Sequence, residues 1–404
     1  MPVEIRAPEL FGVTHTSATI AFSVEDEHGP VAARSRVRID GEVRAECDGD
    51  HAQLVHIEGL EPGRSYSLSI EADSAQPATP DAFLPERFET LAAPRAEAVA
   101  RFATMNDLHF GEPRFGGTLL ENGDYGPDAP GFPSTHAGET DVPYWRFMND
   151  DAIAEINAAD VDATFIKGDI ADRGLPEQFG FAAESFARFE QPHHAFLGNH
   201  DYYAALDGLE VDGYTLLGQP RAPRSVELGG WQVILLETVE PGEHHGVFGE
   251  ARRAWLTQAL EATRESATPT LIMMHHQPVP PQYANSYPNN IGMEPADSVA
   301  LFELLAAHPQ LRGVLIGHTH RNRVRRYAPT GSLPFIEVQC TKDYPGGFGH
   351  YTLYEDGSFR QEVRRTSSPR ALAHSTKCRD FFRGGYRSFS LGTLSERSFH
   401  IAAS

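Results

Sequence analysis

Cysteine is scarce in this chain. Only three occur among its 404 residues, Cys47, Cys340 and Cys378. They are too few and too scattered for a disulfide framework or a thiolate metal site, which agrees with a reducing compartment. We therefore expect each cysteine to be a small buried residue without a bonding role.

Long apolar runs are missing as well. No stretch approaches the ~18 apolar residues of a membrane span, and the opening residues, MPVEIRAPEL, lack the basic-then-apolar pattern of a secretory signal. These two absences predict a protein without a membrane span and with a cytoplasmic location.

Basic residues are outnumbered. The sequence has 34 Lys and Arg against 56 Asp and Glu, which gives a formal net charge of −22. This charge repels a nucleic-acid backbone at long range and argues against binding of a nucleic-acid duplex. A small anionic substrate would need a strong local cation in order to bind.

Residues 1–94 are predicted to form an all-β sandwich. Short strand-like segments, the first at 11–17 and the last at 87–91, are separated by Gly, Pro, Asp and Glu. The segment GLEPGRSYSLSIEA resembles the tyrosine-corner region of fibronectin type III modules, with Tyr66 placed to bond back to the backbone. Because no His clusters with Asp or Glu here, we expect a supporting or interaction role for this domain.

After the linker LAAPRAEA the pattern changes. Strand-like runs alternate with helical ones from Val99 onward, which is typical of a layered α/β domain. We predict a catalytic domain over 95–365 and a C-terminal tail over 366–404.

Polar residues gather at the ends of the predicted strands. Five strands end in blocks built mainly from Asp, Asn and His: NDLH at 106–109, GDIADRG at 168–174, GNHD at 198–201, MHH at 274–276 and GHTH at 317–320. In an extended segment, side chains two residues apart point the same way, so Asp107 and His109 should converge on one point. The same holds for His318 and His320.

These blocks supply a set of metal ligands at one sheet edge. The set is Asp107, His109, Asp169, Asn199, His275, His318 and His320. Seven ligands exceed the need of one ion, and mixed N and O donors without thiolate suit Mn, Fe, Zn or Co rather than Ca or Mg. We therefore expect two divalent or mixed-valence transition-metal ions ~3.5–4 Å apart, bridged by Asp169, with a shared water as the nucleophile.

The five blocks together resemble the calcineurin-like metallophosphoesterases, whose pattern is D-x-H, G-D-x-x-D, G-N-H-D/E, a later His and G-H-x-H. The resemblance covers about residues 98 to 350 and implies a four-layer αββα fold with metals at the strand ends. It assigns the ligands to one metal as Asp107, His109, Asp169 and His320, and to the other as Asp169, Asn199, His275 and His318.

The resemblance also implies roles for neighbouring residues. His276 is an alternative ligand, and we choose His275 because family members commonly place the ligand first in such a pair. His200 becomes the catalytic acid or phosphate-binding group, with the carboxylate of Asp172 holding it protonated, because a nearby carboxylate raises the pKa of a histidine. Arg173 is either a phosphate clamp in substrate binding or a surface residue.

Asp201, the last residue of the GNHD block, is expected to cap the turn that follows. Two divalent ions and two carboxylates leave a local charge of about +2 within an acidic protein. That charge is the local cation which an anionic phosphate ester requires.

Within the family, the run LLETVEPGEHHGVFGEARRAWLTQAL followed by MMHHQPVP resembles the class III cyclic-nucleotide phosphodiesterase and glycerophosphodiesterase branch. Purple acid phosphatases carry a metal-binding tyrosine after the second Asp, where this chain has Ile170, Ala171 and Asp172. The predicted reaction is attack of a metal-held hydroxide on the phosphorus of a small phosphodiester. A phosphomonoesterase with the same metal core is the alternative, and a non-catalytic binding module is a third hypothesis.

Two segments depart from compact members of that branch. The Gly- and Pro-rich insert at 111–144 follows the first metal block and should either shape substrate choice or form a passive surface loop. The tail mixes Arg with Phe and Tyr, which suits docking onto the catalytic domain or onto a second subunit in a homo-oligomer.

Overall fold

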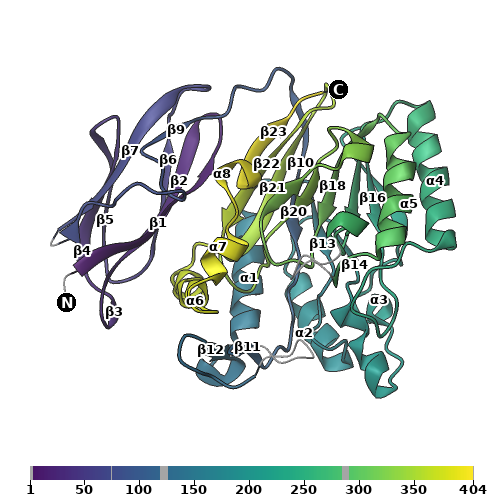
Figure 1. Ribbon diagram of the computed structural model, residues 1–404, viewed down its shortest axis with the longest axis horizontal. Coiled ribbons are helices and arrows are strands. Elements are labelled where there is room, and N and C mark those ends of the chain that lie inside the picture. The colour runs from purple at the N-terminus through teal and green to yellow at the C-terminus, as the bar shows by residue number, and fades with distance from the viewer. Residues whose placement is uncertain (1–2, 74, 119–125, 284–290, 404) are drawn as a thin grey trace.

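The N-terminal strands form two facing β-sheets (Figure 1). The computed structural model describes residues 3–73, 75–118, 126–283 and 291–403, so residues 119–125 of the expected insert lie outside the described part. One sheet has the order β3-β2-β1-β8 with β6 beside β2, and the other has the order β5-β4-β7-β9. The strands are β1 (Val3–Val13), β2 (Ser17–Asp26), β3 (Gly29–Pro30), β4 (Ala33–Ile39), β5 (Glu42–Gly49), β6 (Gln53–Glu58), β7 (Ser65–Ala72), β8 (Ala75–Gln76) and β9 (Arg87–Glu89).

Alternating apolar residues close this sandwich. In β7 the pattern places Tyr66, Leu68 and Ile70 in the core, while the residues between them face outward. The hydroxyl of Tyr66 accepts a hydrogen bond from the main-chain N of Glu61 at 2.7 Å, which confirms the expected bond back to the backbone. The likeness to fibronectin type III modules stays a prediction.

The expected first strand at 11–17 is wrong at both ends. The observed β1 begins at Val3, and the chain turns between Thr14 and Ser17. The hydroxyl of Thr14 accepts hydrogen bonds from the main-chain N of Thr16 and Ser17 at 3.1 and 3.0 Å. Such side-chain acceptors stabilise a turn in place of strand pairing.

Two further sheets form the centre of the catalytic domain. One has the order β14-β13-β10-β21-β22-β23 and the other β15-β16-β17-β18-β20-β19. Their strands are β10 (Ala98–Met105), β13 (Ala163–Lys167), β14 (His193–Phe196), β15 (Arg224–Leu228), β16 (Trp231–Leu236), β17 (Thr270–Met274), β18 (Leu311–Ile316), β19 (Arg323–Arg325), β20 (Phe335–Glu337), β21 (Gly347–Tyr354), β22 (Phe359–Arg365) and β23 (Ser398–Ile401).

Helices cover the outer faces of these sheets (Figure 1). The helices are α1 (Tyr144–Asn157), α2 (Pro176–Phe186), α3 (Gly213–Leu216), α4 (Glu250–Glu265), α5 (Pro295–Ala306), α6 (Pro369–Arg379), α7 (Tyr386–Ser390) and α8 (Leu394–Arg397). A small ribbon of β11 (Arg114–Gly116) and β12 (Ser134–His136) lies in the insert. Within the described residues, no helix is both long and apolar enough to cross a membrane.

Three apolar clusters hold the layers together. One cluster joins the two sheets and contains Phe102 and Phe165. A second cluster lies on the first sheet and contains Met148 of α1. A third lies on the second sheet and contains Leu256 of α4 and Leu301 of α5. Full burial of each such side chain contributes roughly 1.5–3 kcal/mol. The expected four-layer αββα fold with an N-terminal all-β domain is confirmed.

Strand direction brings the polar blocks together. Strands β10, β13 and β14 run parallel, as do β16, β17 and β18, so their carboxyl ends meet along one edge of each sheet. The first candidate ligand follows the end of its strand by one to three residues in all five blocks.

The C-terminal tail lies between the N-terminal sandwich and the catalytic sheets, where Figure 1 shows α6, α7 and α8 in yellow. Its strand β23 pairs with β22, and its helix α6 packs on α1. The tail therefore contributes to the catalytic sheet itself. The division at 1–94, 95–365 and 366–404 remains our proposal.

Candidate active site

The ligands expected for the first metal lie close together. Nitrogen and oxygen atoms of Asp107, His109 and His320 are all within 4.8 Å of one another. The Nε2 atoms of the two histidines are 3.3 Å apart, and His320 Nε2 is 3.6 Å from Asp107 Oδ1. Donor atoms from two strand ends thus converge on one point.

The ligands expected for the second metal meet around His275. Its Nε2 lies 3.1 Å from Asp169 Oδ2 and 3.2 Å from Asn199 Oδ1. His318 joins His275 and His276 in a further group within 4.8 Å. Asp169 also groups with His109 and His200, so it lies between the two sets, as a bridging carboxylate must.

The backbone achieves this convergence by a route that the sequence argument did not foresee. Asp107, His109, His318 and His320 have φ of 55°, 43°, 66° and 51°, so the two blocks are not extended. Non-glycine residues adopt this left-handed region rarely and at a cost of about 1–3 kcal/mol, and they cluster at functional sites. The expectation of extended segments was therefore wrong, although the side chains do converge.

Glycines make room for the crossing loops. A Cβ on Gly198 would lie 2.3 Å from Asp169 Oδ1 and 2.4 Å from the main-chain N of Asp169. Gly168 has a φ of +84°, and its Cβ would lie 2.6 Å from His275 Nδ1. Only glycine therefore allows these loops to bring Asp169, Asn199 and His275 into contact.

The donor chemistry fits transition metals. Burial lowers the pKa of His109 well below its usual value and that of His318 to about 3, so both imidazoles are neutral and available as ligands at neutral pH. Burial lowers the pKa of His275 too, but the carboxylates of Asp169 and Asp107 outweigh it and raise that pKa to about 9. A metal would take the place of that proton.

His275 is better placed than His276 to be the ligand. His276 is turned so that its Nδ1 lies 2.9 Å from the hydroxyl of Thr238, although its Nε2 is buried without a hydrogen-bond partner in the described part of the chain. The main-chain oxygen of Lys167 lies 2.7 Å from His275 Nδ1, which orients Nε2 toward Asp169.

His200 also lies at the cluster, in a different relation to Asp172 than expected. Its Nδ1 is 2.8 Å from the main-chain oxygen of Asp172, while the Asp172 carboxylate is 3.5 Å from His109 Nδ1. A carbonyl only accepts hydrogen bonds, so it fixes a hydrogen on His200 Nδ1 and leaves Nε2 for a substrate. The main-chain oxygen of Asp172 thus orients the ring, and the role of its carboxylate toward His200 stays a prediction.

Asp201 does not cap the turn after it. Its carboxylate accepts hydrogen bonds from the main-chain N of Ala171 at 2.7 Å, Gly198 at 2.8 Å and Ile170 at 3.2 Å. Burial and the nearby Asp169 raise its pKa to about 7, although these donors lower it. The residue ties the GDIAD loop to the GNHD loop.

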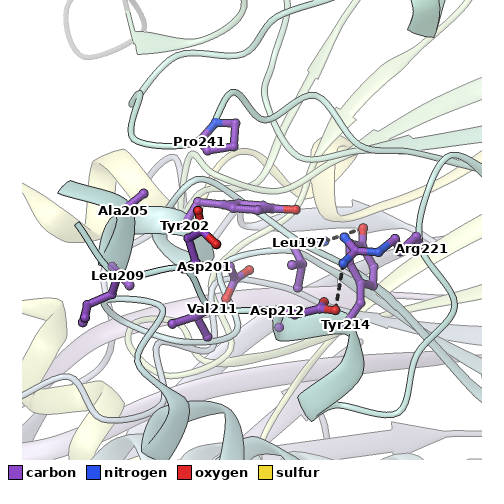
Figure 2. A pocket seen from close by; sticks show the side chains of 13 residues that line it. Leu197, Asp201, Tyr202, Ala205, Leu209, Val211, Asp212, Tyr214, Arg221 and Pro241 are labelled. Atoms are coloured by element: carbon purple, nitrogen blue, oxygen red, sulfur yellow. Dashed lines mark hydrogen bonds and ion pairs between the residues drawn. The ribbon is translucent and has the colours of Figure 1, made fainter. Parts of the chain in front are cut away.

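A further cavity, of about 390 Å³, is lined in part by Asp201. Figure 2 shows Tyr202 and Tyr214 in it, with Arg221 paired to Asp212 at 2.8 Å. None of the seven expected ligands is among the described residues that line it. The cavity is therefore lined by other residues than the candidate ligands.

Asp343, which the sequence reasoning missed, supports His320. Its Oδ2 lies 3.1 Å from His320 Nδ1, the arrangement by which a carboxylate orients a metal-binding imidazole. The Nζ atom of Lys342 lies 3.5 Å from this carboxylate and 2.8 Å from the carboxylate of Glu112 in the insert, so it links the two acidic groups. Burial raises the pKa of Glu112 to about 7. The polar block TKDYPGG after a strand was the available signal.

Two cavities flank the cluster and share His320. One, of about 740 Å³, is lined by His109, His200 and Arg173. The other, of about 200 Å³, is lined by His318 and a group of aromatic side chains. Arg173, which lines the first cavity, is partly exposed, and its guanidinium lies 3.7 Å from the carboxylate of Asp207.

The four layers and the His, Asp and Asn cluster at the strand ends define a class of metal-dependent hydrolases. The model of the family described as calcineurin-like phosphoesterase matches residues 100–322, just over half of the chain. The chain belongs to this calcineurin-like phosphoesterase family, and it is a hydrolytic phosphoesterase.

Curated relatives match the same region. A probable cyclic nucleotide phosphodiesterase of a Synechococcus species is 28% identical over 212 residues, which cover 50% of this chain and 76% of the relative. A 3′,5′-cyclic adenosine monophosphate phosphodiesterase of Pseudomonas aeruginosa is 28% identical over 216 residues, or 51% and 75% of the two chains. Among solved structures, a dimetal phosphatase from Danio rerio aligns with a TM-score of 0.48 and 15% identity over 67% of this chain and 97% of that one.

Proposed function

We propose that the chain is a dinuclear metal-dependent phosphodiesterase that hydrolyses a small diester such as a cyclic nucleotide or a glycerophosphodiester. The observation that carries this proposal is the pair of cavities on either side of His320, of about 740 and 200 Å³. A diester has two ester arms, so its enzyme needs space on both sides of the phosphate. The names of the curated relatives, cyclic nucleotide phosphodiesterases, support the same substrate class.

The proposed metal ligands are the seven residues predicted from the sequence, with Asp169 shared between the two ions. Two transition-metal ions, drawn from Mn, Fe, Zn and Co, would supply an activated water and stabilise charge on the phosphoryl oxygens. The support is the spacing of the donor atoms: those of the His and Asp ligands lie within 4.8 Å of one another in overlapping groups, and Asn199 Oδ1 lies 3.2 Å from His275 Nε2.

His200 is the proposed catalytic acid. The main-chain oxygen of Asp172 lies 2.8 Å from Nδ1 and keeps a hydrogen there, so Nε2 is the nitrogen that would donate a proton to the departing ester oxygen, from the doubly protonated imidazolium form of the ring. The main-chain N of His200 donates to Asp169 Oδ1 at 2.9 Å, which keeps the ring beside the cluster. Asp172 is thus a positioning residue in this proposal.

Arg173 is the proposed substrate-binding cation. It lines the same cavity as His200, and its guanidinium lies 5.9 Å from the ring centroid of Tyr203. A guanidinium at this position can pair with a non-reacting phosphate oxygen or with a polar group on one ester arm.

A phosphomonoesterase remains the second candidate, and one feature favours it. Both Arg114 and Arg173 line the larger cavity, and a phosphate monoester carries more negative charge than a diester. Two cations near the phosphate would select for that additional charge.

Hydrolysis of bis(p-nitrophenyl) phosphate beside p-nitrophenyl phosphate tests the choice. The protein is stripped of metal, reconstituted with Mn, and compared with its Asn199→Ala variant, in which one ligand oxygen is missing. We expect metal-dependent turnover that favours the diester and falls by about 10²-fold or more in the variant. A preference for the monoester would support the second candidate instead.

The non-catalytic hypothesis has its own test. With His200→Ala, we expect turnover of the diester to fall while the bound metal stays at the wild-type level, because no ligand is removed. Metal-loaded wild-type protein that hydrolyses neither ester nor any cyclic nucleotide would contradict the phosphodiesterase proposal.

A further inference from the structure

The smaller of the two cavities beside the cluster has aromatic walls. Its described lining includes Phe115 from β11 of the insert and Phe382, Tyr386 and Phe389 from the tail. We refer to the cavity that these four side chains line as the aromatic cleft. The metal-proximal end of the cleft is formed by His318 and His320, so anything bound in it would lie next to the phosphate.

The rings of the aromatic cleft pack on one another. Tyr386 lies 5.5 Å from Phe115, 5.5 Å from Phe382 and 6.1 Å from Phe389 between ring centroids. Phe115 and Tyr386 are buried, while Phe382 and Phe389 are partly exposed. The partly exposed rings of Phe382 and Phe389, which pack on the buried ring of Tyr386, form a surface on which a planar group can stack.

The aromatic cleft is attached to the ligand loop. Asn322 lies two residues after His320. Its main-chain N donates a hydrogen bond to the main-chain oxygen of Ser390 at 2.9 Å, and its side-chain Nδ2 donates one to the main-chain oxygen of Leu391 at 3.2 Å. These oxygens belong to the end of α7, which carries Tyr386 and Phe389. These hydrogen bonds therefore hold the stacking surface at a fixed distance from the cluster.

Polar groups at the edge of the aromatic cleft suit a ring that bears heteroatoms. The guanidinium of Arg321 lies 5.2 Å from the ring centroid of Phe389. The hydroxyl of Thr319, which also lines the cleft, is buried without a hydrogen-bond partner in the described part of the chain.

We propose that the aromatic cleft binds a planar aromatic group, of the size of a nucleobase or an aryl ring, carried by the substrate phosphodiester. The inference rests on the proposed function and specifies its substrate class. Ligand pockets for drug-sized molecules measure about 300–1,000 Å³, so a cleft of about 200 Å³ accommodates one ring system rather than a larger group. Stacking on aromatic side chains recognises such rings regardless of their precise substitution.

A pair of diesters with the same leaving group isolates the role of the cleft. Bis(p-nitrophenyl) phosphate keeps an aryl group on its second arm, whereas methyl p-nitrophenyl phosphate does not. In Phe389→Leu we expect kcat/KM for the aryl diester to fall about tenfold and that for the methyl diester to change less than twofold. Phe399→Leu, a change to a partly buried ring in β23 outside the cleft, should leave both values unchanged.

Other outcomes would overturn the inference. Equal losses on both diesters in Phe389→Leu would indicate a structural effect, and no loss on either would exclude stacking. A similar loss on hexyl p-nitrophenyl phosphate would mean that the cleft recognises any apolar arm rather than a planar ring.

Failure of the proposed function itself is recognised separately, by absent turnover of both diesters in metal-loaded wild type. The cleft is then tested by calorimetry in a His200→Ala background, with adenosine 5′-monophosphate and ribose 5-phosphate as probes. We expect the nucleotide to bind at least tenfold more tightly, and Phe389→Leu to remove that difference. Equal affinity for the two probes in the parent would contradict ring binding.

Discussion

At the scale of single residues, the cluster depends on atoms that are not ligands themselves. Gly198 permits close approach of two loops, Asp343 orients a histidine, and the main-chain oxygen of Asp172 orients another. These contacts explain how ligands in left-handed backbone conformations are held in place, since the surrounding bonds offset the strain.

We expect Gly198→Ala to lose metal and activity together. The added Cβ would lie 2.3 Å from Asp169 Oδ1, so the bridging carboxylate must move. Metal content by atomic absorption should fall well below two ions, and hydrolysis should fall by about 10²-fold or more. Gly180→Ala is the matched control, because nothing lies within 4 Å of its Cβ in helix α2. That control should retain metal, and equal metal content in both variants would refute the expectation.

Asp343→Asn should weaken metal binding without removing a ligand. The amide oxygen can still accept a hydrogen bond from His320 Nδ1, which the carboxylate approaches at 3.1 Å, but the negative charge is lost. We expect an affinity loss of about 10–100-fold, measured by competition with a chelator. Asp356→Asn, at the turn between β21 and β22, is the control. Unchanged affinity in Asp343→Asn would mean that the carboxylate charge does not support the site.

At the scale of elements, the tail helix α6 contributes a buried histidine to the catalytic domain. His374 stacks on Tyr144 of α1 with 4.9 Å between ring centroids, and its Nε2 lies 3.1 Å from the main-chain oxygen of Lys342. Burial lowers its pKa from 6.5 to about 4. The contact between α6 and α1 is therefore made with a neutral imidazole.

This depressed pKa makes stability depend on pH. As pH falls from about 6.5 to 4, the unfolded chain takes up a proton on His374 before the folded chain does, so stability is lost over that window. The loss amounts to about 3 kcal/mol at 1.36 kcal/mol per pKa unit. In His374→Leu we expect a shallower fall of Tm between pH 6.5 and 4. His28→Leu, on an exposed turn, should keep the wild-type slope.

At the scale of the whole molecule, the N-terminal sandwich holds the tail against the catalytic domain. Arg397 in α8 is buried, and its guanidinium donates to the main-chain oxygens of Phe11 at 2.7 Å and Leu10 at 2.9 Å in β1. It also donates to those of Leu391 at 2.9 Å and Gly392 at 2.6 Å in the tail. One side chain thus joins two regions that are far apart in the sequence.

Arg397→Met should therefore loosen the tail. Four carbonyl oxygens lose their donor, and each buried acceptor left unsatisfied costs about 1–3 kcal/mol. We expect a lower Tm by calorimetry and faster proteolytic removal of the tail. Since the tail carries Tyr386 and Phe389, any preference for aryl diesters should weaken as well. Arg326→Met, at an exposed position, is the control, and equal behaviour of the two variants would contradict this role for Arg397.

The sequence by itself determined the family, the four-layer fold and the list of candidate ligands. This was possible because each block of ligands begins within three residues of the end of a parallel strand, and parallel strands bring their carboxyl ends to one edge. Local spacing and strand direction therefore suffice to group Asp107, Asp169 and His275. The reason given for convergence was nevertheless wrong, because a left-handed φ is not visible in a D-x-H pattern.

Only the tertiary structure decided which distant groups support those ligands. Asp343 meets His320, the main-chain oxygen of Asp172 meets His200, and Asp201 joins two loops. It also brought Phe115 of the insert and Phe382 of the tail, which are more than 250 residues apart, into one aromatic cleft beside the cluster. Such contacts depend on packing between elements of large sequence separation, which residue patterns along the chain do not encode.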